Sequence, residues 1–428
     1  MTPMNFNAQQ CSCYYIGSIQ CNSKHVKQFE NKEIWQRIVD EMNIGVNCSD
    51  VNQTPQFSRL SQVTEDMSTL LYESVINSVY PNEKLQKEKI YNEVSSYKIS
   101  IDRDIQLIKY DKNSIVHVED IRLYTFPFDI MLFSINIIWK DNTSFDTITH
   151  HGAIIRQIEH YKDNNVAEEF VSLYIPILKL YNEANRGAEI YINDVAKLYL
   201  ILHKVNKLKS YIIAQTDHET ESRFSNEYSI DHLLYDVATL SPIGAAIDSE
   251  SAISPSKNYF NNLINNNKID CFNSWQALSL VDTFCCILNS HTSSFHFNTQ
   301  WRIWYFEYLY LNVLYLKTFM LDMLDKFNTH SHSKKVFESV RAVDKIFNHY
   351  NVSYNFLPDI TYRKMREGME IEDELNAIKN QIEAYENYDE QRRERKLNKL
   401  VVWLTVITAI ACFNDIWEIA LKICKLLN

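Results

Sequence analysis

Asn398, Thr405 and Cys412 are the residues whose spacing points most directly to a chemical role. They stand seven residues apart in a stretch without Gly or Pro, so a helix would place them close to one face. Val401 and Leu404 lie beside them on that face. The oxygens of Asn398 and Thr405 could contact a hydrated ion there, while the apolar side chains close a pore by excluding water. The same spacing also suits the seam of a coiled coil or helical bundle.

The rest of the sequence gives little sign of catalysis. The histidine groups His150-His151 and His330-Ser331-His332 have no Cys or carboxylate at ligand spacing on the same element, so we expect no metal site and no enzyme. The six glycines are isolated, which excludes the usual Gly-rich phosphate loops. Nucleotide binding through aromatic and basic side chains stays open, and its pocket residues are unknown at this point.

Composition and charge narrow the class of protein. The nine cysteines are scattered, odd in number and preceded by no secretory signal, so we expect a reducing cytoplasm and no disulfide framework. The net charge of −11 gives no broad face for nucleic acid, and we expect no nucleic-acid partner. The chain is 46% hydrophobic and 23% charged, which is enough apolar material for a sizeable core.

A basic cluster followed by an apolar run suggests contact with a membrane. The apolar run, residues 400–413, contains no charged residue. The residues just before it form what we call the basic collar: Arg392, Arg393, Arg395, Lys396 and Lys399. Basic residues beside an apolar helix mark the cytoplasmic face of membrane proteins. We therefore expect a transmembrane pore helix over 397–428, at the inner membrane, with the N-terminal domain in the cytoplasm.

Two features of this run weigh against spanning by a lone helix. Its fourteen uncharged residues are fewer than the roughly 20 that a membrane span needs. Asn414 and Asp415 follow directly and would have to face other helices or a water-filled pore. A buried or surface-lying C-terminal helix is the alternative.

The sequence predicts an α+β fold. Alternation over 97–126 predicts strands, the apolar run over 127–139 a central strand covered on both faces, and 208–216 a further strand. Residues 1–30 are expected to be a loose lead-in with one short strand. Residues 218–229 are expected to form a polar loop. Helices are expected over 32–45, 60–91, 149–161, 192–205, 275–288 and 300–327.

These elements suggest four segments and one long rod. Residues 374–428 contain no helix breaker and predict a single helix of about 80 Å. The expected organisation is an N-terminal α/β cytoplasmic domain with a central sheet (1–240), a linker (241–268), a helical bundle and stalk (269–396), and the C-terminal transmembrane pore helix (397–428).

Residues 396–410, KLNKLVVWLTVITAI, resemble the junction between stalk and membrane in the CorA family of divalent-cation channels. In that family a Leu-Asn pair closes the stalk and a Leu-Thr pair opens the pore helix, matching Leu397-Asn398 and Leu404-Thr405 here. The family's Gly-Met-Asn signature would fall near 422–424, which here is Lys-Ile-Cys, and its second transmembrane helix is missing. The chain thus resembles a divergent CorA-like protein.

This resemblance implies a membrane effector, and it leaves two other functions open. Divergent members without the signature accompany type III CRISPR systems, where they look like ion channels or membrane-disrupting proteins in antiviral defence. They are controlled there by SAM-AMP, a nucleotide second messenger made from S-adenosylmethionine and ATP. The resemblance further implies a homo-oligomer, as a pentamer, with the nucleotide bound by the cytoplasmic domain and no other cofactor. The alternatives are a magnesium transporter and a soluble helical interaction protein.

Overall fold

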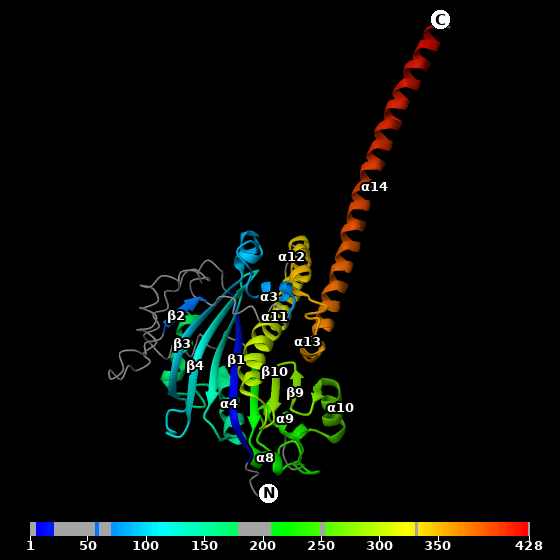
Figure 1. Cartoon of the computed structure of the whole chain (residues 1–428). Coiled ribbons are helices and arrows are strands. Elements are labelled where there is room, and N and C mark those ends of the chain that lie inside the picture. The colour runs from blue at the N-terminus through cyan, green and yellow to red at the C-terminus, as the bar shows by residue number, and fades with distance from the viewer. Residues whose placement is uncertain are drawn as a thin grey trace.

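The computed structural model describes residues 6–20, 56–59, 70–178, 207–248, 253–329 and 333–426. These residues build one ten-stranded mixed sheet with helices on both faces (Figure 1). Its strands, from edge to edge, are β2 (Gln56–Arg59), β3 (Ser95–Gln106), β4 (Ile115–Phe126), β5 (Ile130–Trp139), β1 (Asn7–Gln20), β7 (Lys209–Thr216), β10 (Thr283–Leu288), β9 (Trp275–Leu280) and β8 (Lys268–Phe272). The short β6 (Thr143–Ser144) pairs with the start of β1. Of the pairs described, β7 and β10 run parallel and the others antiparallel.

The strand β1 lies at the centre of the sheet, which differs from the short strand in a loose lead-in that the sequence predicts. It is 14 residues long and pairs with β5 on one side and β7 on the other. The strand contains several polar residues, so its sequence does not look like that of a central strand. One of them, Ser12, is buried and donates a hydrogen bond to the side chain of Asn136 in β5 at 3.1 Å. The predicted central sheet is confirmed.

Side chains of the central strands alternate between two hydrophobic layers. In β1, Cys13 and Tyr15 face one layer, and Tyr14 and Ile16 face the other. The strand β5 is buried on both faces, as its continuous apolar sequence predicts. A strand of this kind is common in parallel sheets, but β5 is antiparallel to both neighbours and gains its second cover from helices.

Helices cover each face of the sheet. The first layer consists of α4 (Phe145–Arg156), α5 (Glu168–Ser172), α9 (Ile230–Thr239) and α10 (Lys257–Asn267), with η5 (Ile158–His160) after α4. The second consists of α3 (Glu73–Asn77), the π-helical η6 (His296–Tyr310), α11 (Leu311–Thr329), α12 (Ser333–Phe347) and α13 (Phe356–Gly368). The short α8 (His218–Ser222) follows β7, and η3 (Leu85–Lys87) and η4 (Tyr91–Glu93) precede β3.

Several predicted helices have a different structure. Residues 275–288 form the hairpin of β9 and β10, because their apolar residues fit a doubly covered strand as well as a buried helix. In the predicted helix over 60–91, the described part holds only α3 and two 3-10 turns, and the predicted loop over 218–229 contains α8. The helices expected over 32–45 and 192–205 lie outside the described residues. The aromatic stretch over 300–327 is helical and buried, as predicted.

A buried ion network joins the sheet to η6. Arg122 of β4 holds Asp120 through two hydrogen bonds of 3.1 Å and also contacts Glu307 of η6. Lys98 of β3 lies 3.0 Å from Asp120, and the hydroxyl of Tyr80 donates to Glu307 at 2.8 Å. Burial alone would raise the pKa of Asp120, but Arg122 and Lys98 hold it below its usual range. Asp120 therefore stays ionised inside the core, whereas burial raises the pKa of Glu307 against the opposing effects of Arg122 and the hydrogen bond from Tyr80.

The longest helix leaves the body of the protein. The helix α14 (Ile371–Leu426) has 56 residues, corresponding to about 84 Å, and its far end points away from the sheet (Figure 1). Within the described part of the chain, no helix combines the length and apolar character that crossing a membrane requires. This finding departs from the transmembrane helix expected over 397–428. The apolar run is short and is followed at once by Asn414 and Asp415.

The ion network predicts a large effect of one substitution. Glu307→Ala leaves the guanidinium of Arg122 buried with one counter-ion fewer, so we expect the free energy of unfolding to fall by about 3–5 kcal/mol. Urea unfolding followed by circular dichroism measures this change. Glu219→Ala removes an exposed carboxylate paired with Arg223 and should change stability by less than about 0.5 kcal/mol. Equal effects of the two substitutions would contradict the role of the network.

Candidate functional site

The first two turns of α14, residues 371–378, pack into the second helical layer, and we call this part the foot of α14. Ile371, Leu375 and Ile378 are buried there at the spacing of one helical face. At the end of α13, a Cβ on Gly368 would lie 2.5 Å from the carbonyl oxygen of Ser279 in β9, so only glycine permits this approach. The turn between α13 and α14 is thus packed closely against β9.

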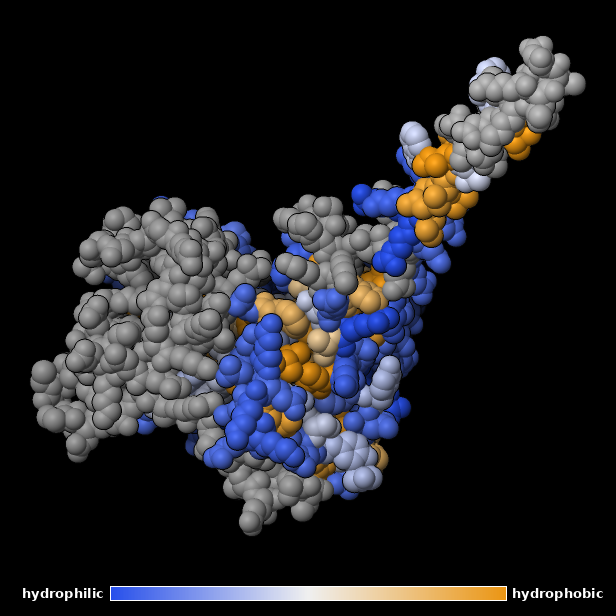
Figure 2. Space-filling model, turned by 90° about the horizontal axis from the view of Figure 1, so that it is seen from above, coloured by the Kyte–Doolittle hydropathy of each residue, from blue (hydrophilic) through white to orange (hydrophobic). Residues whose placement is uncertain are grey.

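Ile382 is the last residue of α14 that packs against this layer, and farther along the helix the described part of the chain leaves a long stretch uncovered. Residues 390–409 are all exposed. Leu400, Val401, Val402 and Trp403 are 55–70% exposed, and four consecutive residues point to all sides of a helix. Figure 2 shows these apolar side chains gathered on the projecting helix above a polar zone. The apolar run therefore presents hydrophobic surface around its circumference.

The predicted pore-lining residues lie on this exposed part of α14. Asn398, Val401, Leu404 and Thr405 are exposed on successive turns. The hydroxyl of Thr405 donates to the carbonyl oxygen of Val401 at 2.8 Å, which leaves its oxygen lone pairs available. The side chain of Cys412 lies outside the described residues. The residues share a helix as predicted, but a pore would need the same residues from other copies.

The predicted basic collar surrounds α14 just before the apolar run. Its five members are exposed: Arg392, Arg393, Arg395, Lys396 and Lys399. They span two turns of helix and so place positive charge on several sides. An apolar rod carrying such a ring is suited to a boundary between water and an anionic apolar phase.

A second candidate site is a pocket beside the foot of α14. A cavity of about 420 Å³ opens where the ends of β1, β5 and β7 meet α11. It contains three lysines, and we call it the lysine pocket. Its polar side chains are Ser18, Lys207, Lys209, Lys317, Thr318, Asp322 and Asp325, and its apolar lining includes Ile16, Ile19, Ile130, Leu132, Leu314 and Leu321.

The charges of the lysine pocket suit an anionic ligand. Burial lowers the pKa of Lys209, and the neighbouring cations Lys317 and Lys207 lower it further. The carboxylate of Asp282 raises this pKa but does not cancel the decrease. The ammonium of Lys209 donates to the carbonyl oxygen of Val281 at 2.9 Å. Lys207 lies 3.7 Å from Asp282 and Lys317 pairs with Glu374, so a phosphate that joined the three ammonium groups would compete with these carboxylates. Asp322, on the facing helix, could accept hydrogen bonds from hydroxyl or amino groups of the same ligand.

Lys317 connects the lysine pocket to α14. Its ammonium lies 2.9 Å from a carboxylate oxygen of Glu374, in the first turn of α14, and its side chain is only 6% exposed. An anion that drew Lys317 into the pocket would compete with Glu374 for the same ammonium. Binding of such an anion would therefore be coupled to the packing of α14 through one side chain.

The residues of the lysine pocket could not be found from the sequence. Lys207 and Lys209 stand two apart at the start of a strand, which is the spacing of one strand face, and this was a weak signal. Lys317 comes from a helix more than one hundred residues later. The pocket forms only because β7 and α11 meet in the fold.

Comparisons with family models, with curated proteins and with solved structures return no match for this chain. Its function therefore has to be argued from its own geometry. Two features stand out among the described residues: the uncovered apolar run of α14 and the lysine pocket beside the foot of that helix.

A half-buried histidine makes the region around the foot of α14 sensitive to acid. Burial and the neighbouring cation Arg366 lower the pKa of His349 to about 4. Arg366 also pairs with Glu372 in the first turn of α14. A protonated His349 would place a second cation beside Arg366 in a largely water-free site.

This depressed pKa predicts a loss of stability in acid. The unfolded chain binds a proton at His349 near pH 6.5, whereas the folded chain does so only near pH 4. The stabilising contribution is therefore complete above pH 6.5 and is lost as the pH falls toward 4. We expect His349→Asn to flatten the pH dependence of the unfolding free energy in this window. The exposed His160→Asn should leave the dependence as in the wild type, and a flattening by both variants would contradict this assignment.

The lysine pocket predicts stabilisation by a phosphate-bearing nucleotide. ATP should raise the melting temperature of the wild-type protein, because a ligand that binds only the folded state stabilises it. Lys209→Met keeps the apolar stem but removes the charge, and the ATP-dependent shift should disappear. Lys112→Met changes an exposed lysine outside the pocket and should keep the shift. No shift in the wild type, or the same shift in both variants, would contradict anion binding in this pocket.

Proposed function

We propose that this protein is a homo-oligomeric membrane effector whose α14 helices insert together into a lipid bilayer under the control of an anionic nucleotide. The observation that carries the proposal is the exposure of the apolar run around its whole circumference. Burying one large apolar side chain is worth about 1.5–3 kcal/mol. The exposed leucines, valines, isoleucines and tryptophans of α14 together represent a strong driving force for lipid or for other copies.

Assembly and insertion need each other in this proposal. A run of fourteen residues spans about 21 Å, whereas the hydrocarbon core of a bilayer is about 30 Å thick. Deeper insertion would carry Asn414, Asp415 and Glu418 into the bilayer. Polar groups at that depth are tolerated where they face neighbouring helices or water. A ring of α14 helices offers such a place, and a lone helix does not.

The arrangement of the proposed pore follows from the helix surface. In a ring of copies, the face with Asn398, Val401, Leu404 and Thr405 would line the axis, and the remaining apolar surface would contact lipid. The basic collar would lie at the level of the lipid phosphates. The resemblance to CorA-like proteins favours a pentamer with this polarity, and the conduction of ions or a wider leak as its output.

Control by a ligand would act through the foot of α14. The lysine pocket has cations for a phosphate and aspartates for hydroxyl or amino groups, so a nucleotide conjugate such as SAM-AMP suits its chemistry. Ligand binding would change the partner of Lys317 and with it the seating of α14 through Glu374. This agrees with the role in type III CRISPR defence that the resemblance implies.

Membrane fractionation of the full chain tests the proposal. We expect the wild-type protein to sediment with membranes, to resist extraction by salt and to require detergent for purification as an oligomer. The double variant Val401→Asp and Leu404→Asp should move to the supernatant, because each carboxylate in hydrocarbon costs about 3 kcal/mol. Gln391→Asp adds a charge to the same helix below the basic collar and should remain with the membrane.

Two outcomes of the fractionation would contradict the membrane effector. A wild-type protein that stays in the supernatant as a single chain contradicts the proposal. A detergent-independent oligomer that the two aspartates dissociate would instead identify the apolar run as the seam of a helical bundle in water.

A further inference from the structure

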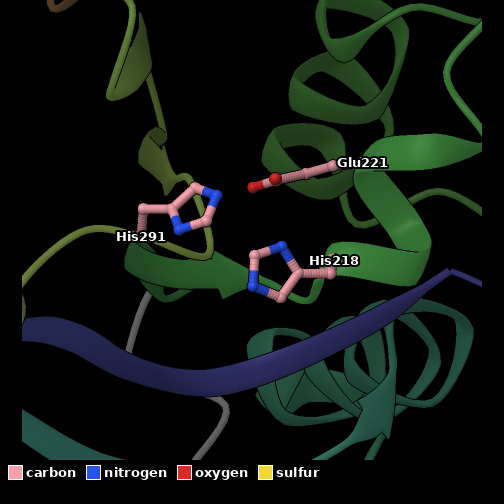
Figure 3. Close-up of side chains that lie close together, drawn as sticks. All are labelled: His218, Glu221 and His291. Carbon is pink, nitrogen blue, oxygen red and sulfur yellow. The ribbon is translucent and has the colours of Figure 1, made fainter.

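Three metal-binding side chains from two distant segments meet at one end of the sheet. His218 and Glu221 belong to α8, and His291 lies in the loop between β10 and η6. One ligand atom from each lies within 4.8 Å of the other two. In Figure 3 the carboxylate of Glu221 points toward the gap between the two imidazole rings. We propose that His218, Glu221 and His291 bind a zinc ion.

The sheet topology explains why these residues meet. The strands β7 and β10 are parallel neighbours, so their carboxyl ends lie at the same edge. The chain continues from β7 through Asp217 into α8, and from β10 into the loop that carries His291. The crevice outside the carboxyl ends of parallel strands is the usual place for ligands in α/β sheets.

The loop that carries His291 is held in place by a buried side chain. The amide nitrogen of Gln215, a residue only 2% exposed, donates to the carbonyl oxygens of Asn289, Ser290 and Thr292 at 3.0–3.1 Å. The other segment is fixed as well, because the side chain of Asp217 caps α8. A site built on rigid segments binds a metal without a large ordering cost.

Hydrogen bonds through Ser290 orient two of the three ligands. The hydroxyl of Ser290 donates to Oε2 of Glu221 at 2.9 Å and therefore accepts from Nδ1–H of His218 at 3.0 Å. This arrangement makes Nε2 of His218 the unprotonated nitrogen. Oε1 of Glu221 already accepts from Thr216 and from the backbone of Ser290, so Oε2 is the less occupied oxygen. Ser290 and Thr216 thus orient the ligands as outer-sphere partners do in zinc proteins.

The ligand set selects the class of metal. Two imidazoles and one carboxylate suit zinc and similar transition metals, whereas magnesium and calcium prefer oxygen ligands alone. His218 and His291 are both exposed, so water or a solute could occupy the fourth position. Three protein ligands with an open position are typical of reactive zinc sites, in contrast to closed structural sites.

Zinc titration of the full chain, purified without a histidine tag and freed of metal, tests this site. We expect one zinc ion per chain by calorimetry, and a visible absorption band of tetrahedral type when cobalt(II) replaces zinc. His218→Ala and His291→Ala should each abolish the band. Ser290→Ala should weaken zinc binding by about 10-fold or more, because it releases the orientation of two ligands.

Controls separate this site from incidental binding by other histidines. The exposed His160→Ala removes a histidine outside the cluster and should leave the stoichiometry and the band unchanged. All substituted side chains are at the surface or in a loop, so circular dichroism of the metal-free variants should match the wild type. Retention of zinc binding by both histidine variants, or absence of the cobalt band in the wild type, would overturn the proposal.

Discussion

The uncovered apolar run of α14 is the feature on which the rest of the account depends. Water penalises exposed hydrocarbon, and globular proteins rarely leave a large contiguous apolar surface uncovered. Here Leu400, Val401, Val402 and Trp403 turn outward on all sides of one helix, far from the sheet. Among the described residues nothing folds back over them. Lipid or further copies of α14 can provide the cover, and the proposed membrane oligomer combines both.

The body of the protein is built so that events in it can reach this helix. The ion network of Asp120, Arg122 and Glu307 joins the sheet to η6, and η6 continues directly into α11. On α11, Lys317 serves both the lysine pocket and the first turn of α14. In the proposed function, a change of charge in the lysine pocket would reach α14 through this one shared side chain. The zinc site proposed at the carboxyl ends of β7 and β10 is carried by other segments and stands independently of this coupling.

The sequence predicts secondary structure within one continuous segment well, but it predicts contacts between residues far apart in the chain poorly. Strong periodicity located the strands over 97–139, the buried aromatic helix and the rod, because each of these signals is contained in one segment. The polar β1 has no such signal, since its burial depends on neighbours on both sides, and the sequence of β9 and β10 also predicts a helix, because short apolar runs fit either structure. The lysine pocket and the histidine cluster join residues about one hundred and about seventy positions apart, and spacing carries no such information.

The environment of Trp403 tests the central claim most directly. Its indole is 70% exposed on the isolated chain and lies inside the apolar run. The difference in fluorescence between the wild type and Trp403→Phe isolates its signal from that of the other tryptophans. If the apolar run inserts into lipid, bilayers with brominated acyl chains should quench this difference signal strongly. A signal that brominated lipid leaves unchanged, while iodide in the water quenches it, would contradict the account.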